Sequence, residues 1–472
     1  MTVPGLCLSE VYVPGSALGA LRSTAAIIAA SAIAACARPA EPSRDQPPPE
    51  PNPAPIAVAS DKRALSPAPA PTRPSPPLNV LLLTVDSLRS DMPWAGYSRQ
   101  IAPRLSELAA RSTVYENHRS VASYTAQTVA TLLSGQYASS LYRDGWFFTG
   151  YHGSNTFFTE VLQTRGVATL GLHAHMYFGK DKGLNQGFDV WETVPGISFD
   201  AQTDKHVTSE KSATRLIELL GEPRFADKPF FAWAHFMDPH DEYIAHAESP
   251  DFGKKNRDRY DSEVFYTDLW IGKVLDFVAS RPFGARTAIL VTGDHGETFG
   301  EHGMYKHAFE LWDVLLRVPL LIHVPGAAPQ RIARGRTHID LAPTILDLLG
   351  VPALDQFAGQ SLVPEVFGKP AEERHPILLE LSEDSHNPGL VALVEGDYKL
   401  IMPRIGGGVR LFNLKQDPGE LENLAKREPE KVKELVDLLE SSFDKIPRVE
   451  PYGGMKLKSG RRAQGPEGPA AQ

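Results

Sequence analysis

Cysteine is scarce in this chain, and its scarcity excludes two classes of protein. Only Cys7 and Cys36 occur among the 472 residues. A disulfide-stapled scaffold needs several cysteine pairs, and a thiolate zinc site needs a cluster of cysteines. A basic surplus is also missing, because 57 Asp and Glu outnumber 48 Lys and Arg and leave a net charge of −9. Proteins dedicated to nucleic-acid binding normally carry a basic surface, so we expect no nucleic-acid partner.

Long hydrophobic runs are missing as well, apart from one near residues 24–35, which is too short to cross a membrane comfortably. This run follows Arg22 and ends in Ile33-Ala34-Ala35-Cys36. A basic residue, about a dozen apolar residues and small residues at the end are typical of a secretory signal. The last four residues resemble a bacterial lipobox, in which the cysteine is lipidated.

We therefore predict that residues 1–36 are a signal peptide with lipidation at Cys36. An ordinary cleaved signal with a chance cysteine is the alternative. The lipidated protein is expected to be an exported bacterial lipoprotein that faces the periplasm or the cell exterior. It would contact the membrane through the lipid anchor only.

Proline composition separates a linker from the folded part of the chain. Residues 37–77 contain 14 of the chain's 40 prolines, among Ala, Ser and scattered charges. Such a segment cannot bury enough apolar area to fold, so it is predicted to be a disordered, semi-rigid tether. The folded body is expected to begin at residue 78, and residues 451–472 are predicted to be a disordered tail.

Alternating apolar runs and helical patterns indicate the fold class of the body. Four runs read as buried strands: Asn79–Val85, Pro229–Phe236, Thr287–Thr292 and Val318–Val324. Helical patterns lie between them at Ile101–Ser112, Thr125–Leu133, Ser209–Leu220, Ser262–Ser280 and Leu341–Leu349. This alternation predicts an α/β protein whose large, mostly parallel sheet is flanked by helices on both faces.

Carboxylates and imidazoles follow several of these predicted strands directly. Asp86 follows the first strand, and Asp294 and His295 follow the strand that begins at Thr287. One carboxylate at a strand end is usually a cap or a turn residue. Several at the ends of separate parallel strands are expected to meet at one edge of the sheet. Two carboxylates and an imidazole suit one divalent metal ion: calcium, manganese, magnesium or zinc.

Thr125 is the candidate nucleophile. It begins the helical pattern that Gly135 ends. A hydroxyl at a helix N-terminus lies beside unpaired backbone N–H groups and the positive end of the helix dipole, where an anion is favoured. From this stretch alone two interpretations stay open, a nucleophile or a plain threonine N-cap.

Motifs from residue 78 to about 442 resemble, in order, the sulfatase branch of the alkaline-phosphatase superfamily. They are Asp86–Asp91, Thr125–Gly135, Gly187–Asp189, His235–His240, Thr292–Glu297, Gly300–Gly303, His307, Arg317–Leu320, His338–Thr344, Asp397–Leu400, Leu411–Glu420 and Glu422–Leu424. The resemblance implies a catalytic domain over residues 78–370 and a small C-terminal α+β subdomain, a sheet plus a helix, over residues 371–450. It also implies a metal held by Asp86, Asp294 and His295, with Thr125 as nucleophile and further ligand.

The chain departs from this family at the nucleophile. Type I sulfatases carry Cys or Ser followed by x-Pro-x-Arg, and the Cys or Ser is oxidised to formylglycine. Here Thr125, Gln127 and Val129 stand at the corresponding positions. Ser87 stands where many sulfatases have a second metal-binding aspartate. The site therefore resembles the one-Asp, Asp-His pattern of phosphonate monoesterases and lipoteichoic-acid synthase-like enzymes.

Threonine at this position affects the expected substrate. A threonine sulfate cannot collapse to an aldehyde, whereas a threonine phosphoester can be resolved by in-line attack of water at phosphorus. The sequence therefore indicates a hydrolase of sulfate or phosphate mono- or diesters, with phosphate favoured. The substrate would be a small molecule or a glycan or lipid ester. Two alternatives stay open: a phospho-group transferase of the lipoteichoic-acid synthase type, and an inactive sulfatase-like envelope protein with a binding or structural role.

Histidines supply the remaining candidate site residues. His307 or His235 is expected to protonate the leaving oxygen, and His240 to contact a nonbridging oxygen. His175 alternates with His173 as strand neighbours do, and we take it as a substrate-binding candidate beside a structural alternative. Adjacent residues on a helix point in different directions, so only one of Lys306 and His307 is expected in the site, and we take His307.

Overall fold

The computed structural model describes residues 76–197, 207–226, 228–374 and 376–452, all of which lie within one compact unit, Pro67–Gln472. The predicted signal peptide with Cys36, nearly all of the predicted linker and the tail from residue 453 lie outside the described residues. Within the described ranges no helix is long and apolar enough to span a membrane.

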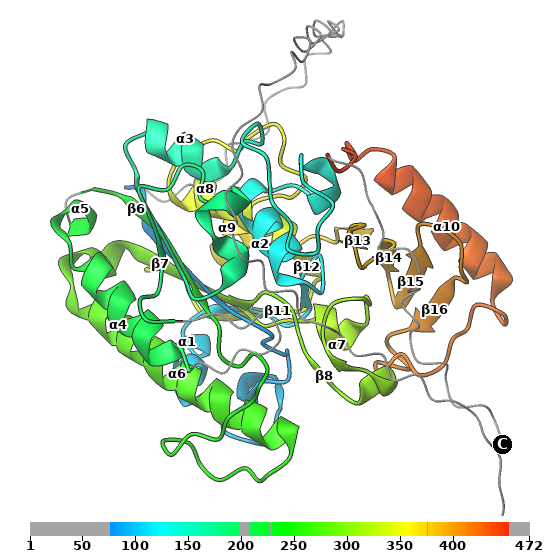
Figure 1. Cartoon of the computed structure of the whole chain (residues 1–472), viewed down its shortest axis with the longest axis horizontal. Helices are drawn as coiled ribbons and strands as arrows, with labels where there is room; N and C mark the ends of the chain where they lie inside the picture. Colours follow the sequence, from blue (N-terminus) through cyan, green and yellow to red (C-terminus); the bar gives the residue numbers. More distant parts are fainter. Residues whose placement is uncertain (1–75, 198–206, 227, 375, 453–472) are drawn as a thin grey trace, which may run out of the picture. The chain divides into compact units, whose positions relative to one another are not determined.

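The fold is α/β and centres on a mixed, mostly parallel sheet (Figure 1). In the described part of the chain this sheet has eight strands, in the order β11-β2-β10-β7-β1-β6-β4-β5. Their bounds are β1 (Asn79–Val85), β2 (Thr113–Tyr115), β4 (Ala168–His173), β5 (Val190–Thr193), β6 (Phe230–Phe236), β7 (Thr287–Gly293), β10 (Leu320–His323) and β11 (Gln330–Ile332). The central strand β1 pairs in parallel with both β6 and β7.

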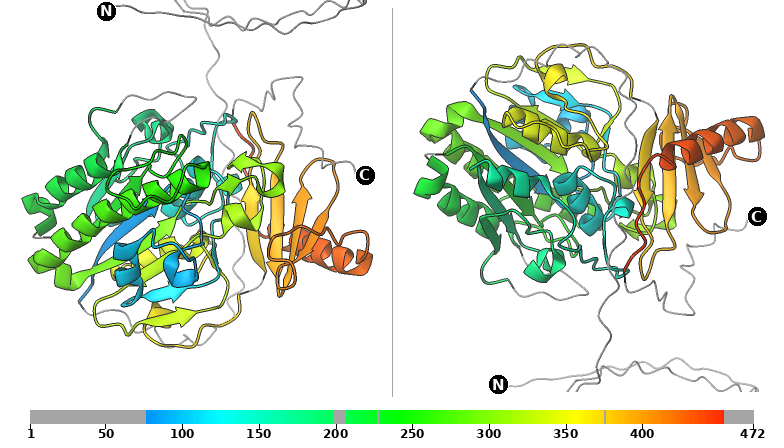
Figure 2. Two further views of the ribbon diagram at one scale, coloured as in Figure 1. Left: turned by 90° about the horizontal axis from the view of Figure 1, so that it is seen from below. Right: turned by 90° about the horizontal axis from the view of Figure 1, so that it is seen from above.

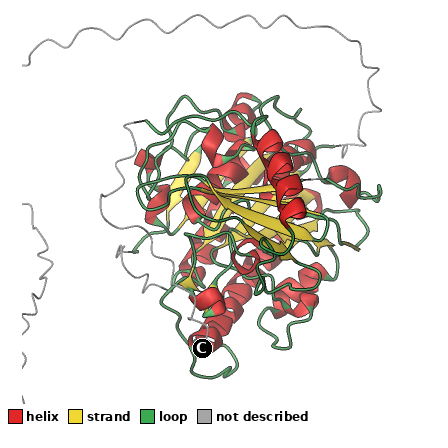
Figure 3. Cartoon of the chain, turned by 90° about the vertical axis from the view of Figure 1, so that its right-hand side faces the viewer, coloured by secondary structure: helices red, strands yellow, loops and turns green. Residues whose placement is uncertain are grey.

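Helices cover both faces of this sheet, as the continuous apolar strands predict (Figure 3). Alternate residues of β1 belong to different cores: Leu81 and Leu83 to one, Val80 and Leu82 to the other. The first core includes α1 (Pro103–Ala109), α4 (Ser209–Leu220), α5 (Pro223–Ala226) and α6 (Asn256–Ser280). The second includes α2 (Thr125–Ser134), α3 (Phe158–Thr164), α8 (Leu341–Leu348) and α9 (Val363–Val366).

The predicted strands and helices are confirmed, with one difference in strand direction. The predicted run Val318–Val324 forms β10, which pairs antiparallel with β7 and with β2. Hydrophobic periodicity carries no information about strand direction, because a buried strand has the same apolar composition in either orientation. Two shorter sheets pair β3 (His118–Arg119) with β12 (Arg336–Thr337) and β8 (Thr298–Phe299) with β9 (Tyr305–Lys306).

A small antiparallel sheet follows the large one in sequence, as predicted (Figure 2). It runs in the order β13 (Ile377–Leu381), β14 (Leu390–Glu395), β15 (Tyr398–Pro403) and β16 (Arg410–Asn413). Leu393 and Leu400 of this sheet form a core with Leu435 and Leu439 of α10 (Pro429–Phe443). The division at residues 370/371 stays a prediction, since all described residues form one compact unit.

The small sheet packs on the beginning of α2. Leu379 and Leu381 of β13 share a core with Tyr124 and Ala126, the two neighbours of Thr125. The backbone N–H of Glu380 also donates to the Val121 carbonyl at 2.9 Å. The C-terminal sheet therefore supports the segment that presents the candidate nucleophile.

Candidate active site

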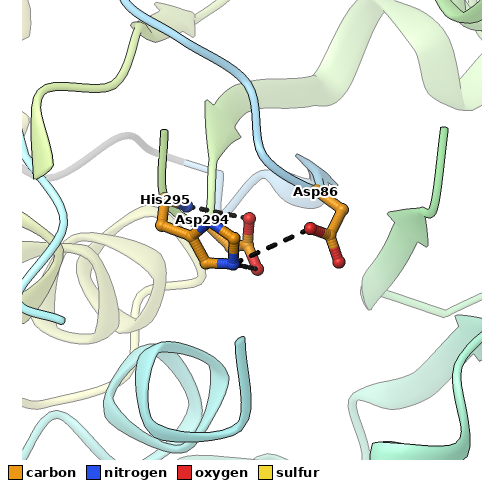
Figure 4. Close-up of side chains that lie close together, drawn as sticks. All are labelled: Asp86, Asp294 and His295. Carbon is orange, nitrogen blue, oxygen red and sulfur yellow. Dashed lines mark hydrogen bonds and ion pairs between the residues drawn. The ribbon is translucent and has the colours of Figure 1, made fainter. Parts of the chain in front are cut away.

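Three polar side chains meet at the carboxyl ends of two adjacent strands (Figure 4). Asp86 follows β1, and Asp294 and His295 follow β7, which pairs in parallel with β1. One ligand atom from each residue lies within 4.8 Å of the others, and all three side chains are buried. Carboxyl ends of parallel strands are where open α/β sheets place their ligands. The predicted convergence of these three residues is confirmed.

The chemistry of this group fits a divalent cation. Nδ1 of His295 donates to the Gly296 carbonyl at 2.9 Å, which leaves the Nε2 lone pair for a metal. Oδ2 of Asp294 is buried and accepts no hydrogen bond from the described residues. A buried carboxylate oxygen without a donor is costly unless a cation binds it. Two carboxylates and one imidazole suit hard and borderline divalent metals.

Burial and neighbouring charges set the protonation of these ligands. Burial opposes ionisation of Asp86, but the charge of His240 and a hydrogen bond from His235 hold its pKa well below the usual value. Burial and the charge of Asp86 raise the pKa of Asp294. Burial lowers the pKa of His295, so its imidazole is neutral and able to bind a metal. A bound cation would favour the ionised form of Asp294.

Ser87 holds the two carboxylates in place through a strained backbone. Its φ is 55°, in the left-handed region that a side chain rarely adopts. In this conformation its N–H donates to Asp294 Oδ1 at 3.0 Å and its hydroxyl donates to Asp86 Oδ1 at 2.9 Å. Ser87 therefore orients both carboxylates.

Thr125 is the first residue of α2. Its hydroxyl points to Asp86, Asp294 and His295, which we call the metal-binding group. Its Oγ1 lies 3.0 Å from His295 Nε2 and 3.5 Å from Asp86 Oδ2. Tyr124 is the N-cap residue, so the plain N-cap interpretation of Thr125 is wrong. Gly135 ends the helix at φ 67°, as predicted.

Gln127 and Val129 serve packing rather than the site. The Gln127 side-chain amide pairs with the backbone of Ser382, through Nε2–H···O at 3.1 Å and N–H···Oε1 at 2.9 Å. Val129 is buried in the second core of the large sheet. The helix contains no Lys or Arg, so no cation from it lies beside Thr125.

His235 has both ring nitrogens in hydrogen-bond contacts. Nδ1 lies 2.8 Å from Thr84 Oγ1, and Nε2 lies 3.2 Å from Asp86 Oδ2. Trp233 Nε1 also donates to Thr84 Oγ1 at 2.9 Å, which fixes that hydroxyl. This geometry favours His235 as a residue that orients Asp86, and it leaves His307 as the stronger candidate for the proton donor.

His307 contacts a buried carboxylate that the sequence did not assign to a role. Its Nδ1 lies 3.3 Å from Glu297 Oε2, and Tyr243 donates its hydroxyl to the same oxygen at 2.8 Å. Burial acts to raise the pKa of Glu297, but His307, His240 and the Tyr243 hydroxyl keep it below its usual value. A charged Glu297 fixes the His307 ring with Nδ1–H donating, so Nε2 is left for the substrate.

The other predicted substrate contacts lie next to His307. The His240 and His307 rings are 5.0 Å apart, and the His307 ring is 4.2 Å from that of His295. The His175 ring is 6.3 Å from that of His240, and its Nδ1 accepts from the Tyr177 N–H at 3.0 Å. The fold thus brings together the histidines that the sequence analysis selected.

Lys306 and His307 do not lie on a helix, contrary to the expectation. Tyr305–Lys306 forms β9, and a φ of 71° at Lys306 turns the chain before His307. The Lys306 ammonium extends to Asp241 at 2.5 Å and is half exposed, while His307 lies at the metal-binding group. His302 stacks on Trp312 at 3.8 Å, which supports a structural role.

Three further buried histidines lie outside the group of imidazoles around the metal-binding site. His118 and His338 face each other with ring centroids 4.9 Å apart, and His173 packs between Phe178 and Trp191. In the described structure both nitrogens of His118 and Nδ1 of His338 lack hydrogen-bond partners. Burial lowers the pKa of His338 and of His173 to about 3, and that of His118 well below its usual value.

These histidines predict a loss of stability in mild acid. The unfolded chain binds their protons near pH 6.5 and the folded chain does not, so stability is complete above pH 6.5. It should fall below that pH by up to about 1.4 kcal/mol per pH unit for each histidine. Urea denaturation of the metal-free protein at pH 7.5 and 5.0 measures this loss. The loss should be smaller in His118→Leu; an unchanged pH dependence would contradict the assignment.

Metal binding should stabilise the fold. A cation held only by the native state at 100 times its dissociation constant adds about 2.7 kcal/mol to the free energy of unfolding. We expect calcium, manganese, magnesium or zinc to raise the melting temperature of chelator-treated protein. Asp294→Asn should abolish most of that increase, because it removes a buried anionic ligand. An equal increase in the variant would place the metal elsewhere.

The fold and this site define a class of protein: an α/β protein with a buried Asp/Asp/His group that could hold a metal ion, and a hydroxyl beside it, at the carboxyl edge of its sheet. The family profile described as "Sulfatase" matches residues 78–351. A second profile, "N-sulphoglucosamine sulphohydrolase, C-terminal", matches residues 300–448. The first match covers more than half of the chain, so the chain belongs to the sulfatase family.

Individual relatives agree with this assignment. The chain is 33% identical over 176 residues to choline-sulfatase of Rhizobium meliloti (strain 1021). This alignment covers 36% of this chain and 33% of that protein. It is 30% identical over 165 residues to the Delta 4,5-hexuronate-2-O-sulfatase of Bacteroides thetaiotaomicron. This second alignment covers 33% of this chain and 34% of that protein. These alignments span only about a third of each curated relative.

Solved structures share the fold over most of the chain. A 2-O GAG sulfatase has a TM-score of 0.67 at 19% identity and covers 78% of this chain and 92% of its own. The phosphonate monoester hydrolase of Silicibacter pomeroyi has a TM-score of 0.61 at 20% identity and covers 78% of this chain and 96% of its own. At these identities the likeness concerns the fold alone.

Proposed function

We propose that this protein is a metal-dependent hydrolase of phosphate, phosphonate or sulfate esters that uses Thr125 as its nucleophile. The observation that carries the proposal is the position of Thr125 Oγ1, 3.0 Å from His295 Nε2 and 3.5 Å from Asp86 Oδ2. A hydroxyl at this distance can share the coordination sphere of a metal held by Asp86, Asp294 and His295. Such a metal would lower the hydroxyl pKa and polarise the ester.

The residues of the chain support a two-step displacement. The Thr125 hydroxyl gives its proton to solvent, its Oγ1 forms a bond to phosphorus as the bond to the leaving oxygen breaks, and His307 gives that oxygen a proton. Water then attacks phosphorus as the bond from phosphorus to Thr125 Oγ1 breaks, the proton of the water passes to His307, and Oγ1 takes a proton back from solvent. His240 and His175 lie on the side of His307 where the nonbridging oxygens would need hydrogen-bond donors.

Phosphorus esters are favoured over sulfate esters as substrates. Threonine cannot form the formylglycine hydrate that releases sulfate by collapse to an aldehyde. Val129 also occupies the position of the bracing arginine and is buried. Choline-sulfatase and the hexuronate sulfatase act on sulfate esters by name, while a phosphonate monoester hydrolase is among the structural neighbours. A neighbour solved with D-glucosamine-2-N,6-O-disulfate and another with neocarrahexaose support a sugar-containing ester.

A panel of nitrophenyl esters tests the proposal. The sulfate, phosphate, phosphodiester and phosphonate esters are each assayed with calcium, manganese, magnesium and zinc. We expect turnover of phosphorus esters to exceed that of the sulfate. A clear preference for sulfate would overturn the argument from Thr125. Metal binding without turnover of any ester would favour an inactive binding protein, and transfer of the phospho-group to an added alcohol would favour a transferase.

We also propose that the chain is an exported lipoprotein anchored through Cys36. The support is the sequence of residues 22–36. Expressed in a bacterium, the wild type should sediment with membranes and incorporate labelled fatty acid. Cys36→Ser should be soluble and unlabelled; equal labelling of the two proteins would contradict lipidation at this residue.

A further inference from the structure

Three imidazoles form one half of a series of ring contacts beside Thr125. The ring of His307 lies 5.0 Å from that of His240, which in turn lies 6.3 Å from that of His175. His175 stacks on Tyr177 at 3.9 Å. This half is polar, and together with the metal-binding group it suits the anionic part of a substrate.

Four carbon rings continue this series of ring contacts. Tyr177 contacts Phe148 at 4.9 Å, Phe148 contacts Phe147 at 5.5 Å, and Phe147 lies parallel to Phe309 at 5.8 Å and 7°. Phe309 follows His307 by two residues, so the two ends of this series of rings are close in the chain. We call Tyr177, Phe148, Phe147 and Phe309 the aromatic arc.

The aromatic arc adjoins the nucleophile. Tyr124, the residue before Thr125, stacks on Phe147 at 4.4 Å and meets the edge of Tyr177 at 5.6 Å. Tyr124 and Thr125 are 1% exposed, whereas Phe309 is 44% exposed and the other three members of the arc are half-buried. The arc therefore runs from the buried residue before the nucleophile to an exposed ring.

The backbone presents Phe309 at a conformational cost. Ala308 and Phe309 have φ values of 64° and 61°, which only glycine adopts without strain. Two hydrogen bonds with Ser123 hold this conformation. The Ala308 N–H donates to the Ser123 carbonyl at 2.9 Å, and the Ser123 hydroxyl donates to the Glu310 carbonyl at 2.6 Å. Strain of this kind gathers at ligand-binding sites. A strained, exposed ring beside the nucleophile points to a ligand contact rather than to core packing.

The opposite side of the arc is also fixed. The Phe147 N–H donates to Ser385 Oγ at 3.1 Å, and the Lys182 ammonium donates to the Phe148 carbonyl at 3.1 Å. Preorganised aromatic faces bind flat apolar surfaces at little cost in conformational entropy. The ammonium beside Phe148 disfavours a cationic ligand.

We propose that the aromatic arc is a specificity-determining subsite that binds the ring of a phenol or cyclic alcohol in the ester substrate. This proposal rests on the proposed function, because it places the leaving group relative to Thr125. The anionic group would lie at the imidazoles and the metal-binding residues, and the ring would lie against Phe309 and Phe147. Acyclic esters would lack this contact.

Inert sulfonates test the subsite without turnover. Calorimetry on the full chain, loaded with the metal that gives the largest rise in melting temperature, compares benzenesulfonate, cyclohexanesulfonate and methanesulfonate. We expect at least one ring sulfonate to bind about 3- to 10-fold more tightly than methanesulfonate, the scale of one aromatic contact. Benzenesulfonate as the tighter ligand indicates a phenol, and cyclohexanesulfonate indicates a cyclic alcohol. Equal affinity of all three, or tighter binding of 3-(trimethylammonio)propanesulfonate, would overturn the proposal.

Variants locate the effect. Phe309→Ala should remove most of the preference for a ring while methanesulfonate affinity stays within about 2-fold. Tyr142→Ala is the matched control, because Tyr142 is a 52% exposed aromatic residue outside the arc. A preference that survives Phe309→Ala, or that is lost in Tyr142→Ala, contradicts the subsite. Ring-dependent binding without turnover of any ester would reject the hydrolase alone, and turnover without ring dependence would reject the subsite alone.

Discussion

Thr125→Val should abolish turnover and leave the fold intact. Valine keeps the shape of threonine and removes only the hydroxyl that lies 3.0 Å from His295 Nε2. Removing the nucleophile of a covalent catalyst costs on the order of 10⁵- to 10⁶-fold in kcat. The measurement is kcat on the best ester of the nitrophenyl panel, with circular dichroism and the melting temperature as checks of the fold. Thr125→Ser, which keeps a hydroxyl, should retain part of the activity.

Thr128→Val is the matched control for Thr125→Val. Thr128 is a buried threonine on the same helix, and its hydroxyl donates to the Ala122 carbonyl at 3.2 Å, away from the metal-binding group. Its loss should lower stability by about 1 kcal/mol, the value of one hydrogen bond, with little change in kcat. Retained activity in Thr125→Val would exclude covalent catalysis by this residue. A metal-dependent rise in melting temperature should survive in both variants, because Asp86, Asp294 and His295 remain.

The metal-binding group could be predicted because each ligand follows a long apolar strand. Asp86 and the pair Asp294-His295 are 208 positions apart, yet the strands before them are adjacent in the sheet. Parallel strands covered by helices bring their carboxyl ends to one edge, so the sequence pattern alone places these side chains together. The motif resemblance then supplied Thr125, which periodicity could not distinguish from a helix cap.

Contacts formed by irregular segments could not be predicted. Glu297 lies next to the metal ligands in sequence, but its partner His307 comes ten residues later, after turns with positive φ at Lys306 and before others at Ala308 and Phe309. Lys306, Ala308 and Phe309 are neither glycine nor asparagine, so nothing at these three positions signals a left-handed conformation. The aromatic arc depends on the same turns. The prediction that Lys306 and His307 lie on a helix was wrong for this reason.

The second large effect concerns a buried charge network that joins the small sheet to Arg119 and Asp313, which precede it in the chain. Lys399 of β15 is fully buried, and its ammonium lies 2.8 Å from Glu420 Oε1 and 3.4 Å from Asp313 Oδ1. Arg119 binds the same Asp313 carboxylate at 2.7 and 2.9 Å. Glu420 also accepts the backbone N–H of Asp313 at 2.5 Å. Glu420 therefore links the small sheet to Asp313, which precedes that sheet in the chain.

Lys399→Met should lower the free energy of unfolding by about 3–5 kcal/mol, the cost of leaving one buried charge without its partner. Arg119 still neutralises Asp313, so Glu420 becomes the unpaired group. Burial already raises the pKa of Glu420, and losing Lys399 raises it further. A carboxyl with a folded pKa above its unfolded value destabilises the fold increasingly as pH rises above about 4.3.

The pH dependence separates a lost charge from a lost packing contact. Urea denaturation of Lys399→Met should show a larger loss of stability at pH 8 than at pH 5, whereas a packing defect would be independent of pH. Adding Glu420→Gln should recover part of the loss, because the double variant has no unpaired charge there. Lys433→Met is the surface control: its ion pair with Asp437 on α10 is exposed, and we expect no measurable change. An equal loss at both pH values would show that Lys399 matters for its volume rather than for its charge.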